Sequence, residues 1–330
     1  MAATSTDPLE RLEAALAACG RPRPPSKRML MIVNPHATTV SDRLKNLVVY
    51  ALRGAYRVDA VDTQAKHHAT ELCRDAAGDG YDLVVAFGGD GTVNEAANGL
   101  AGSTTPLSCL PGGRTNVYCR LLGIPTDVVD ATEHLLLLAY DWRPRRVDLA
   151  RVGDRYFLFS AGVGLDAMVV ESVDAHPRLK ARVGEWYYTW TGIGTFNRRY
   201  LFNPPRLQAE LGHDVIAGVT VIVQNAALYT FFGDRPVQMA EGATLDSGDL
   251  AAAVLKRAGP IDIPTIVWRA LSTRARVADH RRVRAFSSLT SLRVRSLDGR
   301  LLPLQVDGDY IGELEEAEFG VTRAGLVVVA

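Results

Sequence analysis

The chain of 330 residues lacks several features that would assign it directly to a broad class. No run of apolar residues approaches the roughly 18 to 20 that a membrane-spanning helix needs. Acidic residues stand near the N-terminus, where a secretory signal would need basic and then apolar residues. The 37 basic and 37 acidic residues cancel, which argues against a general attraction to nucleic acid. We therefore expect a soluble, cytoplasmic protein that does not bind nucleic acid.

Cysteine and lysine are both scarce. The four cysteines, Cys19, Cys73, Cys109 and Cys119, show no C-x-x-C spacing and no clustered histidines. The sequence therefore predicts neither a zinc site nor a redox pair. Five Lys stand against 32 Arg, a ratio that we attribute to a GC-rich genome rather than to function.

The length and the pattern of apolar residues predict two domains, preceded by a short helix over 6–20 and an Arg-Pro-rich linker up to residue 26. Over residues 27–150, apolar strands alternate with amphipathic helices, which is typical of a parallel sheet covered on both faces. Residues 151–330 instead carry short β-rich runs broken by turns, which favours a mainly antiparallel β-sandwich. Its final strand, GLVVVA, suits either domain. Helices are expected near 165–175, 181–196 and 261–271.

A glycine-rich turn interrupts residues 83–100, LVVAFGGDGTVNEAANGL, directly after a predicted strand. Glycine lets backbone N–H groups approach a ligand and reach positive φ. Thr92 and Glu95 have the spacing of a capping box, so the turn leads into a helix N-terminus, where phosphate is favoured. Asp90 suits such a site only if a divalent cation lies between it and the phosphate. The motif matches neither a Walker A loop nor G-x-G-x-x-G, and a turn without ligand is the alternative.

Two further loops follow predicted parallel strands. Residues 112–116, GGRTN, follow the next strand, and Asn34-Pro35 ends the first. Ligands of such sheets bind beyond the carboxyl ends of the strands, so the three loops are expected to face one phosphate chain. Each loop alone is also an ordinary turn.

Several motifs occur in an order that resembles one known family. The motifs are NP after the first strand, GGDGTVNEAANGL, PGGRTNVYCRLLGIP, RRVDLARV, AGVGLDA and a late VDGD. Together they resemble the soluble lipid kinases built on the diacylglycerol kinase catalytic domain, which are relatives of sphingosine and ceramide kinases. The resemblance covers residues 27–330, whereas GGDGT alone is shared with NAD kinases and loosely with phosphofructokinases. It implies a kinase that uses ATP and Mg²⁺ and phosphorylates the hydroxyl of diacylglycerol or a similar lipid.

The resemblance also implies the nucleotide site. The GGDGT loop would bind the ATP phosphates, Asp90 would act through Mg²⁺, and Asp148 would support the metal and water network. Arg114 replaces a nucleotide-contacting Thr of the family and is itself a candidate for phosphate binding. The expected nucleotide-binding residues are Asn34, Thr63, Gly88, Gly89, Asp90, Gly91, Thr92, Val93, Asn94, Gly113, Arg114, Thr115 and Asn116.

The acceptor side of the family carries a carboxylate in an Asp-Gly-Glu turn, and this chain has Asp307-Gly308-Asp309. By resemblance, Asp309 is the general base that accepts the proton of the substrate hydroxyl, with Asp307 beside it. From the residues alone, Asp-Gly between two strands predicts a hairpin.

This chain departs from the family pattern at three further places. Val117 stands where the family has an acid, and the Gly-Gly-Gly expected soon after Asn225 is absent. Asp246-Ser247-Gly248-Asp249 replaces the Asp-Gly-x-Leu that holds a second magnesium in many bacterial members, which weakens the case for a metal at Asp246 and Asp249. Two alternatives therefore stay open: a small-molecule kinase similar to NAD kinase, and a catalytically silent homologue that binds nucleotide or lipid.

Two stretches favour peripheral association with a membrane, where a lipid acceptor would reside. Residues 178–206 mix basic and aromatic side chains, and residues 269–295 are rich in arginine. Tryptophan and tyrosine suit the headgroup level, while basic residues are attracted to anionic lipid. A solvated face or aromatic core packing is the alternative, and a homodimer is compatible with the sequence.

Overall fold

The computed structural model describes residues 27–168, 205–259, 261–272 and 274–330. The predicted helices over 6–20 and 181–196, Cys19 and almost all of the basic aromatic stretch lie outside the described residues. The chain divides into two compact units, the second of which comprises Asp148–Arg323. The first unit ends at Val147, close to the predicted boundary at residue 150, and also includes Ala324–Ala330.

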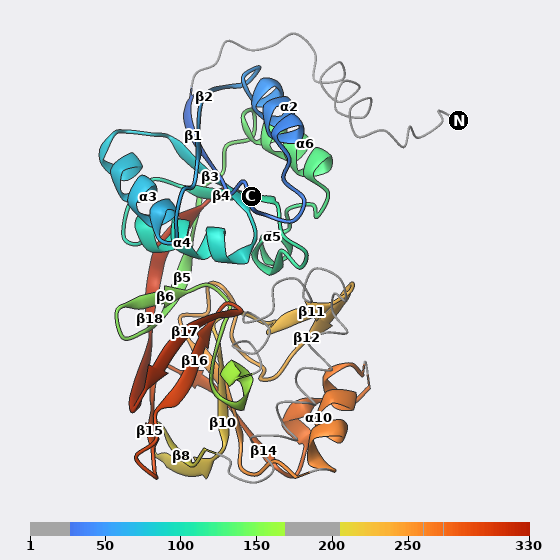
Figure 1. Ribbon diagram of the computed structural model, residues 1–330, viewed down its shortest axis with the longest axis vertical. Helices are drawn as coiled ribbons and strands as arrows, with labels where there is room; N and C mark the ends of the chain where they lie inside the picture. Colours follow the sequence, from blue (N-terminus) through green and yellow to red (C-terminus); the bar gives the residue numbers. More distant parts are fainter. Residues whose placement is uncertain (1–26, 169–204, 260, 273) are drawn as a thin grey trace. The chain divides into compact units, whose positions relative to one another are not determined.

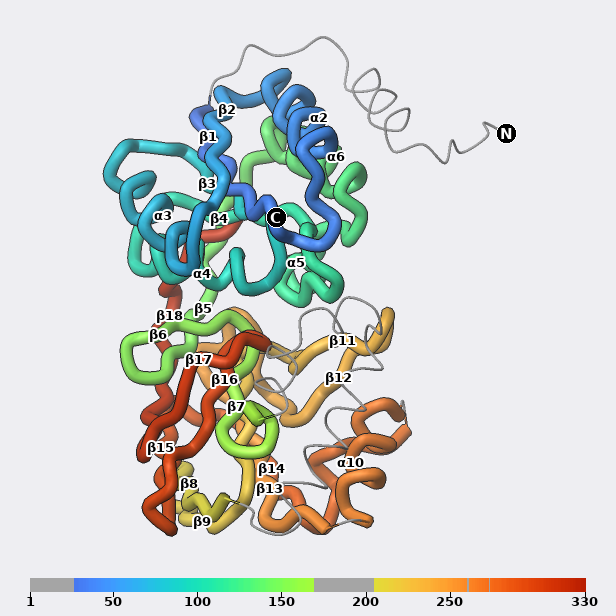
Figure 2. The backbone as a smooth tube through the Cα atoms, viewed as in Figure 1, coloured from blue at the N-terminus to red at the C-terminus, as the bar shows by residue number. Residues whose placement is uncertain are grey.

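The first unit is built on parallel strands. β1 (Lys27–Val33), β2 (Tyr56–Asp62), β3 (Leu83–Gly88) and β4 (Leu107–Pro111) pair in the order β2-β1-β3-β4. Every residue of β3 and β4 is buried, as expected for strands covered on both faces. The end of β18 (Glu316–Val328) joins this sheet, because Val328 pairs with Leu107 in parallel. Figure 2 shows this red C-terminal segment beside β4.

Helices cover this sheet in two pairs, α2 with α6 and α3 with α4, drawn on opposite sides of the strands in Figure 1. Ser41 begins α2, since its hydroxyl accepts a hydrogen bond from the Leu44 amide at 3.2 Å, and Asp127 caps α6 in the same way. The sequence predicted α2, α3 and α4 but not α5 or α6. The helices are α2 (Asp42–Leu52), α3 (His68–Gly78), α4 (Asp90–Leu100), α5 (Val117–Leu122) and α6 (Val128–Leu138).

The second unit contains antiparallel strands in two sets. One is a six-stranded sheet in the order β14-β13-β10-β7-β16-β17, and the other runs β18-β15-β8-β9, with a β5–β6 hairpin beside β18. Buried side chains from both sets form one core, in which the Phe157 and Phe319 rings meet edge to face with centroids 6.3 Å apart. The two sets therefore pack as the predicted antiparallel sandwich, and the fold class is confirmed. Their bounds are β5 (Arg145–Val152), β6 (Arg155–Phe157), β7 (Ser160–Gly164), β8 (Leu207–Leu211), β9 (Asp214–Gly218), β10 (Thr220–Gln224), β13 (Leu250–Leu255), β14 (Val283–Leu289), β15 (Ser291–Ser296), β16 (Leu302–Val306) and β17 (Asp309–Leu314).

Smaller elements complete the second unit. A short hairpin joins β11 (Thr230–Phe232) to β12 (Arg235–Val237), and neither strand was predicted. Helix α10 (Asp262–Ala270) lies within the range expected from the sequence and is followed by the 3₁₀ turn η2 (Val277–Asp279). Within the described part of the chain, no helix is long and apolar enough to cross a bilayer.

Candidate functional site

The two glycine turns of the first unit pack backbone against backbone. The Gly112 amide donates a hydrogen bond to the Gly88 carbonyl at 2.8 Å. A β-carbon at Gly112 would lie 2.8 Å from the Gly88 Cα, and one at Gly113 would lie 2.9 Å from the Gly89 Cα. None of these four residues has the positive φ that the sequence argument allowed for. Glycine is required here because the two turns approach closely at the carboxyl ends of β3 and β4.

Helix α4 begins at Asp90, with Gly89 in the N-cap position and no side chain capping the helix. The predicted capping box is therefore wrong, because Thr92 already lies inside the helix. Its hydroxyl instead accepts a hydrogen bond from Asn34 Nδ2 at 3.2 Å, which ties the start of α4 to the loop after β1. Glu95 accepts a hydrogen bond from the His67 amide at 2.9 Å. The amide groups and dipole of this helix end suit an anion.

Asp90 connects the two turns. Its Oδ2 accepts a hydrogen bond from the Val117 amide and its Oδ1 one from the Tyr118 amide, both at 3.0 Å. The carboxylate therefore caps α5, while Asn116, the residue before that helix, exchanges two hydrogen bonds with the Gly113 backbone at 2.8 and 2.9 Å. Asn116 has a positive φ of 46°, a conformation that asparagine tolerates. The site is thus rigidly cross-linked around Asp90.

The remaining residues predicted for the nucleotide site differ in exposure. The Thr63 amide donates to the Val33 carbonyl at 2.8 Å, which brings Thr63 to the same edge of the sheet. Val93 and Asn94 are each only 1% exposed, so their side chains pack inside the unit. Arg114 is exposed and Thr115 half-buried in the second glycine turn. Only the exposed and half-buried members of the predicted set offer side chains to a ligand.

Acidic side chains do not gather into a metal cage within the described part of the chain. Among residues 27–168, 205–259, 261–272 and 274–330, no group of three or more His, Cys, Asp or Glu could hold an ion. Mg²⁺ in kinases commonly uses one or two carboxylates and takes its other ligands from phosphate and water. Asp90, a half-buried carboxylate at the turn, fits such a site as a group that would hold the ion through water.

The residues proposed for a second metal do not fit one. Asp249 pairs with the Arg323 guanidinium at 3.8 Å, and Arg323 Nε donates to the Gly248 carbonyl at 3.3 Å. Asp246 is exposed and accepts a hydrogen bond from the Thr244 hydroxyl at 2.8 Å. The Arg323 guanidinium therefore supplies a positive charge beside Asp249.

Asp148 lies on β5 within the second unit and is 6% exposed. Its Oδ2 accepts a hydrogen bond from the Gly248 amide at 2.6 Å, and its own amide donates to the Leu245 carbonyl at 2.6 Å. These contacts hold the loop between Leu245 and Gly248. A role for Asp148 in a metal and water network stays a prediction.

The Asp-Gly hairpin predicted from the sequence is present. β16 and β17 pair antiparallel with Val306 opposite Asp309, and Asp307 and Gly308 both have positive φ, 49° and 84°. The Asp307 carboxylate is only 4% exposed and accepts hydrogen bonds from three successive amides, Leu158, Phe159 and Ser160, at 2.7, 3.0 and 3.1 Å. It positions the turn and holds the chain between β6 and β7. Asp309, at the start of β17, is half-buried.

A polar network that the sequence argument did not find supports this turn. Gln305, 1% exposed, donates from Nε2 to Asp166 Oδ2 at 2.7 Å and accepts from the Gly308 amide at 3.0 Å. The Tyr229 hydroxyl donates to Asp166 Oδ1. Burial raises the pKa of Asp166, and the hydrogen bonds from Tyr229 and Gln305 oppose that shift. The signal in the sequence was AGVGLDA, where Gly162 leaves room for the Asp166 carboxylate.

Two cysteines meet beneath the glycine turns. The Sγ atoms of Cys109 on β4 and Cys119 on α5 are 3.1 Å apart, and both residues are buried free thiols. The hydrogen bond with Cys119 and burial raise the pKa of Cys109. The absence of a C-x-x-C motif therefore did not exclude a close thiol pair, because the fold brings together residues ten positions apart.

Comparison with known proteins shows which proteins this chain resembles. Residues 28–152 match the model of the diacylglycerol kinase catalytic domain. The part of the chain that carries both glycine turns is therefore similar to this catalytic domain. It is 26% identical to the diacylglycerol kinase of Staphylococcus haemolyticus over 273 residues, covering 82% of this chain and 78% of that protein. The corresponding protein of Staphylococcus epidermidis is 26% identical over 294 residues, covering 87% of each chain.

The fold also has solved counterparts. A crystal structure of a diacylglycerol kinase from Bacillus anthracis is similar with a TM-score of 0.67, at 20% identity, over 92% of this chain and 96% of that one. The family match contains β1 to β4 and both glycine turns, whereas Asp307 and Asp309 lie outside it. The similarity to this catalytic domain and to these kinases supports an enzyme with a reaction of the lipid-kinase type.

Proposed function

We propose that the protein transfers the γ-phosphate of ATP to the hydroxyl of diacylglycerol or a similar lipid, which gives a product of the phosphatidic acid type. The observation that carries this proposal is the pair of glycine turns packed side by side at the uncapped N-terminus of α4. Amide groups and a helix dipole at such a place favour phosphate. The kinase names of the relatives, which align over most of this chain, support the reaction type.

Groups from both glycine turns and from the Asp-Gly hairpin take part in the proposed phosphate transfer. The turns of the first unit hold the phosphates, with the exposed Arg114 adding positive charge. Asp90 would hold Mg²⁺ through water, and the bound ion would supply positive charge that offsets the charge on the phosphates. The acceptor oxygen forms a bond to the γ-phosphorus, the bond from this phosphorus to the bridging oxygen of ADP breaks, and the hydroxyl proton passes to Asp309. Asp307 fixes the turn that carries Asp309.

One alternative has a specific observation in its favour. Both Asp90 oxygens accept backbone hydrogen bonds, so this carboxylate already has a structural role that a catalytically silent homologue would equally retain. An NAD kinase-like activity has no comparable support, because the relatives reported above carry the name diacylglycerol kinase.

A purified-enzyme screen tests the proposal. The full chain is incubated with ATP, MgCl₂ and a panel of lipid alcohols in mixed micelles, with NAD as a separate acceptor, and products are identified by mass spectrometry. We expect a phosphorylated lipid. Phosphorylated NAD without phosphorylated lipid would replace the proposal by the small-molecule kinase, and nucleotide binding without any product would replace it by the silent homologue.

A further inference from the structure

Helix α10 carries several apolar side chains on its outer side, in addition to Ile263 and Ile266, which pack against the core. Ile261, at its N-cap position, is 75% exposed, Trp268 is 62% exposed and Val267 is 41% exposed, and Pro264 is exposed as well. At 3.6 residues per turn these four side chains lie on one face. We call this surface the α10 face. A surface helix normally keeps its outer face polar and turns its apolar side chains to the core.

The inward face of α10 is polar at its start. Asp262, only 6% exposed, receives Arg281 Nη2 at 3.2 Å and Arg282 Nε at 3.6 Å. The Thr265 hydroxyl lies 3.1 Å from His280 Nε2. Ile266, 7% exposed, packs into an apolar cluster of the second unit. These contacts anchor the inward side of the helix.

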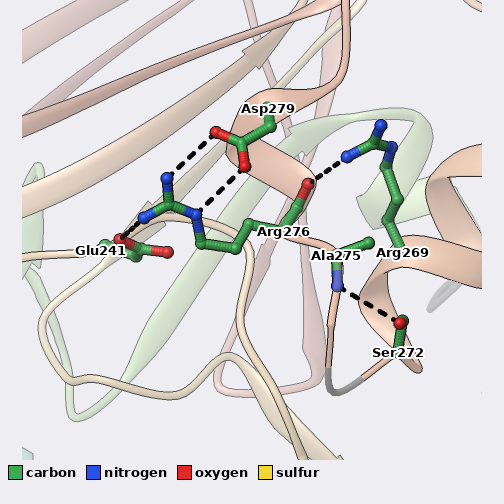
Figure 3. A network of polar contacts seen from close by, with 6 residues as sticks. All are labelled: Glu241, Arg269, Ser272, Ala275, Arg276 and Asp279. Carbon is green, nitrogen blue, oxygen red and sulfur yellow. Dashed lines mark hydrogen bonds and ion pairs between the residues drawn. The ribbon is translucent and has the colours of Figure 1, made fainter.

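The C-terminal end of α10 is also held, as Figure 3 shows. Arg269 Nη1 donates to the Arg276 carbonyl at 3.0 Å, and the Ala275 amide donates to the Ser272 hydroxyl at 3.3 Å. The Arg276 guanidinium pairs in turn with Asp279 and with Glu241, each at 3.1 Å. Because both ends are fixed, the outward direction of the α10 face follows from the fold.

Positive charge is concentrated in the chain segment that carries this apolar surface. Residues 256–284 contain eight Lys and Arg but only two Asp, and both Asp are paired with arginines. Lys256, Arg257 and Arg274 are exposed and form no ion pair within the described part of the chain. The Lys256 amide donates to the Arg282 carbonyl at 2.9 Å, which places this end of the basic segment beside the arginines at the start of α10.

We propose that the α10 face docks on the surface of a bilayer that contains anionic lipid. A tryptophan with aliphatic neighbours suits the headgroup and acyl boundary, and unneutralised basic residues are attracted to anionic headgroups. The inference rests on the proposed function, since a kinase with a lipid acceptor must reach a membrane. A second copy of this chain is disfavoured as occupant because like charges around the two faces would repel.

Vesicle sedimentation tests the α10 face directly. The full chain is mixed with vesicles of phosphatidylcholine alone or of phosphatidylcholine with phosphatidylglycerol, and bound protein is measured. The double variant Ile261→Ser/Trp268→Ser is expected to bind the anionic vesicles about tenfold or more weakly, since it loses the buried apolar area. Serine at the N-cap position favours the helix, so unfolding does not explain a loss.

Matched controls distinguish binding through the α10 face from nonspecific hydrophobic binding. Tyr50→Ser on α2 and Val215→Ser on β9 remove apolar residues that are 73% and 63% exposed elsewhere, and both variants should bind as the wild type does. Replacing Lys256, Arg257 or Arg274 with Gln should weaken binding to anionic vesicles by about fivefold each at low salt. Equal binding of the double variant and the wild type, or no binding by the wild type, would overturn the inference.

A kinase assay with a short-chain diacylglycerol dispersed in detergent distinguishes this inference from the proposed function. The α10 variants should keep their rate with that substrate and lose rate with the same lipid in vesicles. If the enzyme is active but the α10 variants bind vesicles as the wild type does, the proposed docking surface is refuted and the proposed function is not. If the enzyme is inactive but the α10 variants bind vesicles more weakly than the wild type, the proposed function is refuted and the docking surface is not. A change from dimer to monomer in the double variant, with vesicle binding unchanged, would make the face a self-association surface.

Discussion

At the scale of single residues, two aspartates of one turn stand in different surroundings. Three backbone amides hold the Asp307 carboxylate, whereas Asp309 is half-buried at the start of β17. We expect Asp309→Asn to lower the turnover rate by about 100-fold or more, because a general base is lost, with little change in the urea unfolding midpoint. Asp307→Ala should instead lower the free energy of unfolding by about 3 kcal/mol or more, since three buried donors lose their acceptor. Full activity of Asp309→Asn would assign the base elsewhere.

Asp90 is expected to show both a structural and a functional effect. Asp90→Asn should lower the free energy of unfolding by about 1 kcal/mol through a weaker cap on α5, and should also weaken the binding of MgATP. Asp127→Asn is the matched control, because Asp127 caps α6 through the Val129 and Asp130 amides at 2.9 and 3.2 Å. Calorimetric titration should give the Asp127→Asn variant the same affinity for MgATP as the wild type. Equal affinities in both variants would remove Asp90 from the nucleotide site.

Asp166 is expected to make stability depend on pH. Burial raises the pKa of this carboxyl group, so the folded protein binds its proton more tightly than the unfolded chain does. Its contribution to stability is therefore complete below the ordinary carboxyl pKa and is lost as the pH rises through the raised pKa. Urea titrations across this range should show a smaller fall in unfolding free energy for Asp166→Asn than for the wild type. Asp214→Asn, an exposed change on β9, should follow the wild type, and parallel curves for all three proteins would contradict the account.

At the scale of elements, the contact between the two glycine turns is tested by adding one methyl group. Gly112→Ala should lower the free energy of unfolding by about 1 to 3 kcal/mol, because its β-carbon would lie 2.8 Å from the Gly88 Cα. Gly78→Ala, at the end of α3, is the control, since a β-carbon there meets nothing within 4 Å. It should be neutral or stabilising by up to about 1 kcal/mol. A Gly112→Ala protein as stable as the wild type would show that the turns can separate.

The sequence predicted the elements whose periodicity is strong and missed those fixed by distant contacts. Strands β1 to β4 and helices α2 to α4 were expected because apolar runs and amphipathic segments alternate there. The start of α4 was misplaced, because a Thr and a Glu three residues apart imitate a capping box inside the first turn of a helix. The cap that Asp90 provides to α5 joins residues 27 positions apart, and no local sequence pattern indicates such a contact.

The candidate site was predicted unevenly for the same reason. The glycines were found, but their close packing on each other is a property of neighbouring strands and not of either motif. The Asp-Gly hairpin follows from local turn chemistry and is confirmed. The network of Tyr229, Asp166 and Gln305 links three separate segments and could not be read from the chain. Likewise, the outward apolar face of α10 appears only once burial is known.

At the scale of the whole molecule, the proposed reaction divides its tasks between the two units. Asp90 and the glycine turns belong to the first unit, while Asp148, Asp307 and Asp309 belong to the second. The chain passes between the units in β5 and again in β18, and the terminal strand completes the parallel sheet through Val328. Neither unit alone holds all the groups that the proposal uses.

The most direct test follows phosphate from ATP to lipid. Purified full-length protein is supplied with ATP labelled in the γ-phosphate, Mg²⁺ and diacylglycerol, and the lipid extract is analysed for the label. The account predicts labelled phosphatidic acid with the wild type and with Asp127→Asn, and none above background with Asp90→Asn. Unlabelled lipid from the wild type, or equal labelling by Asp90→Asn, would contradict it.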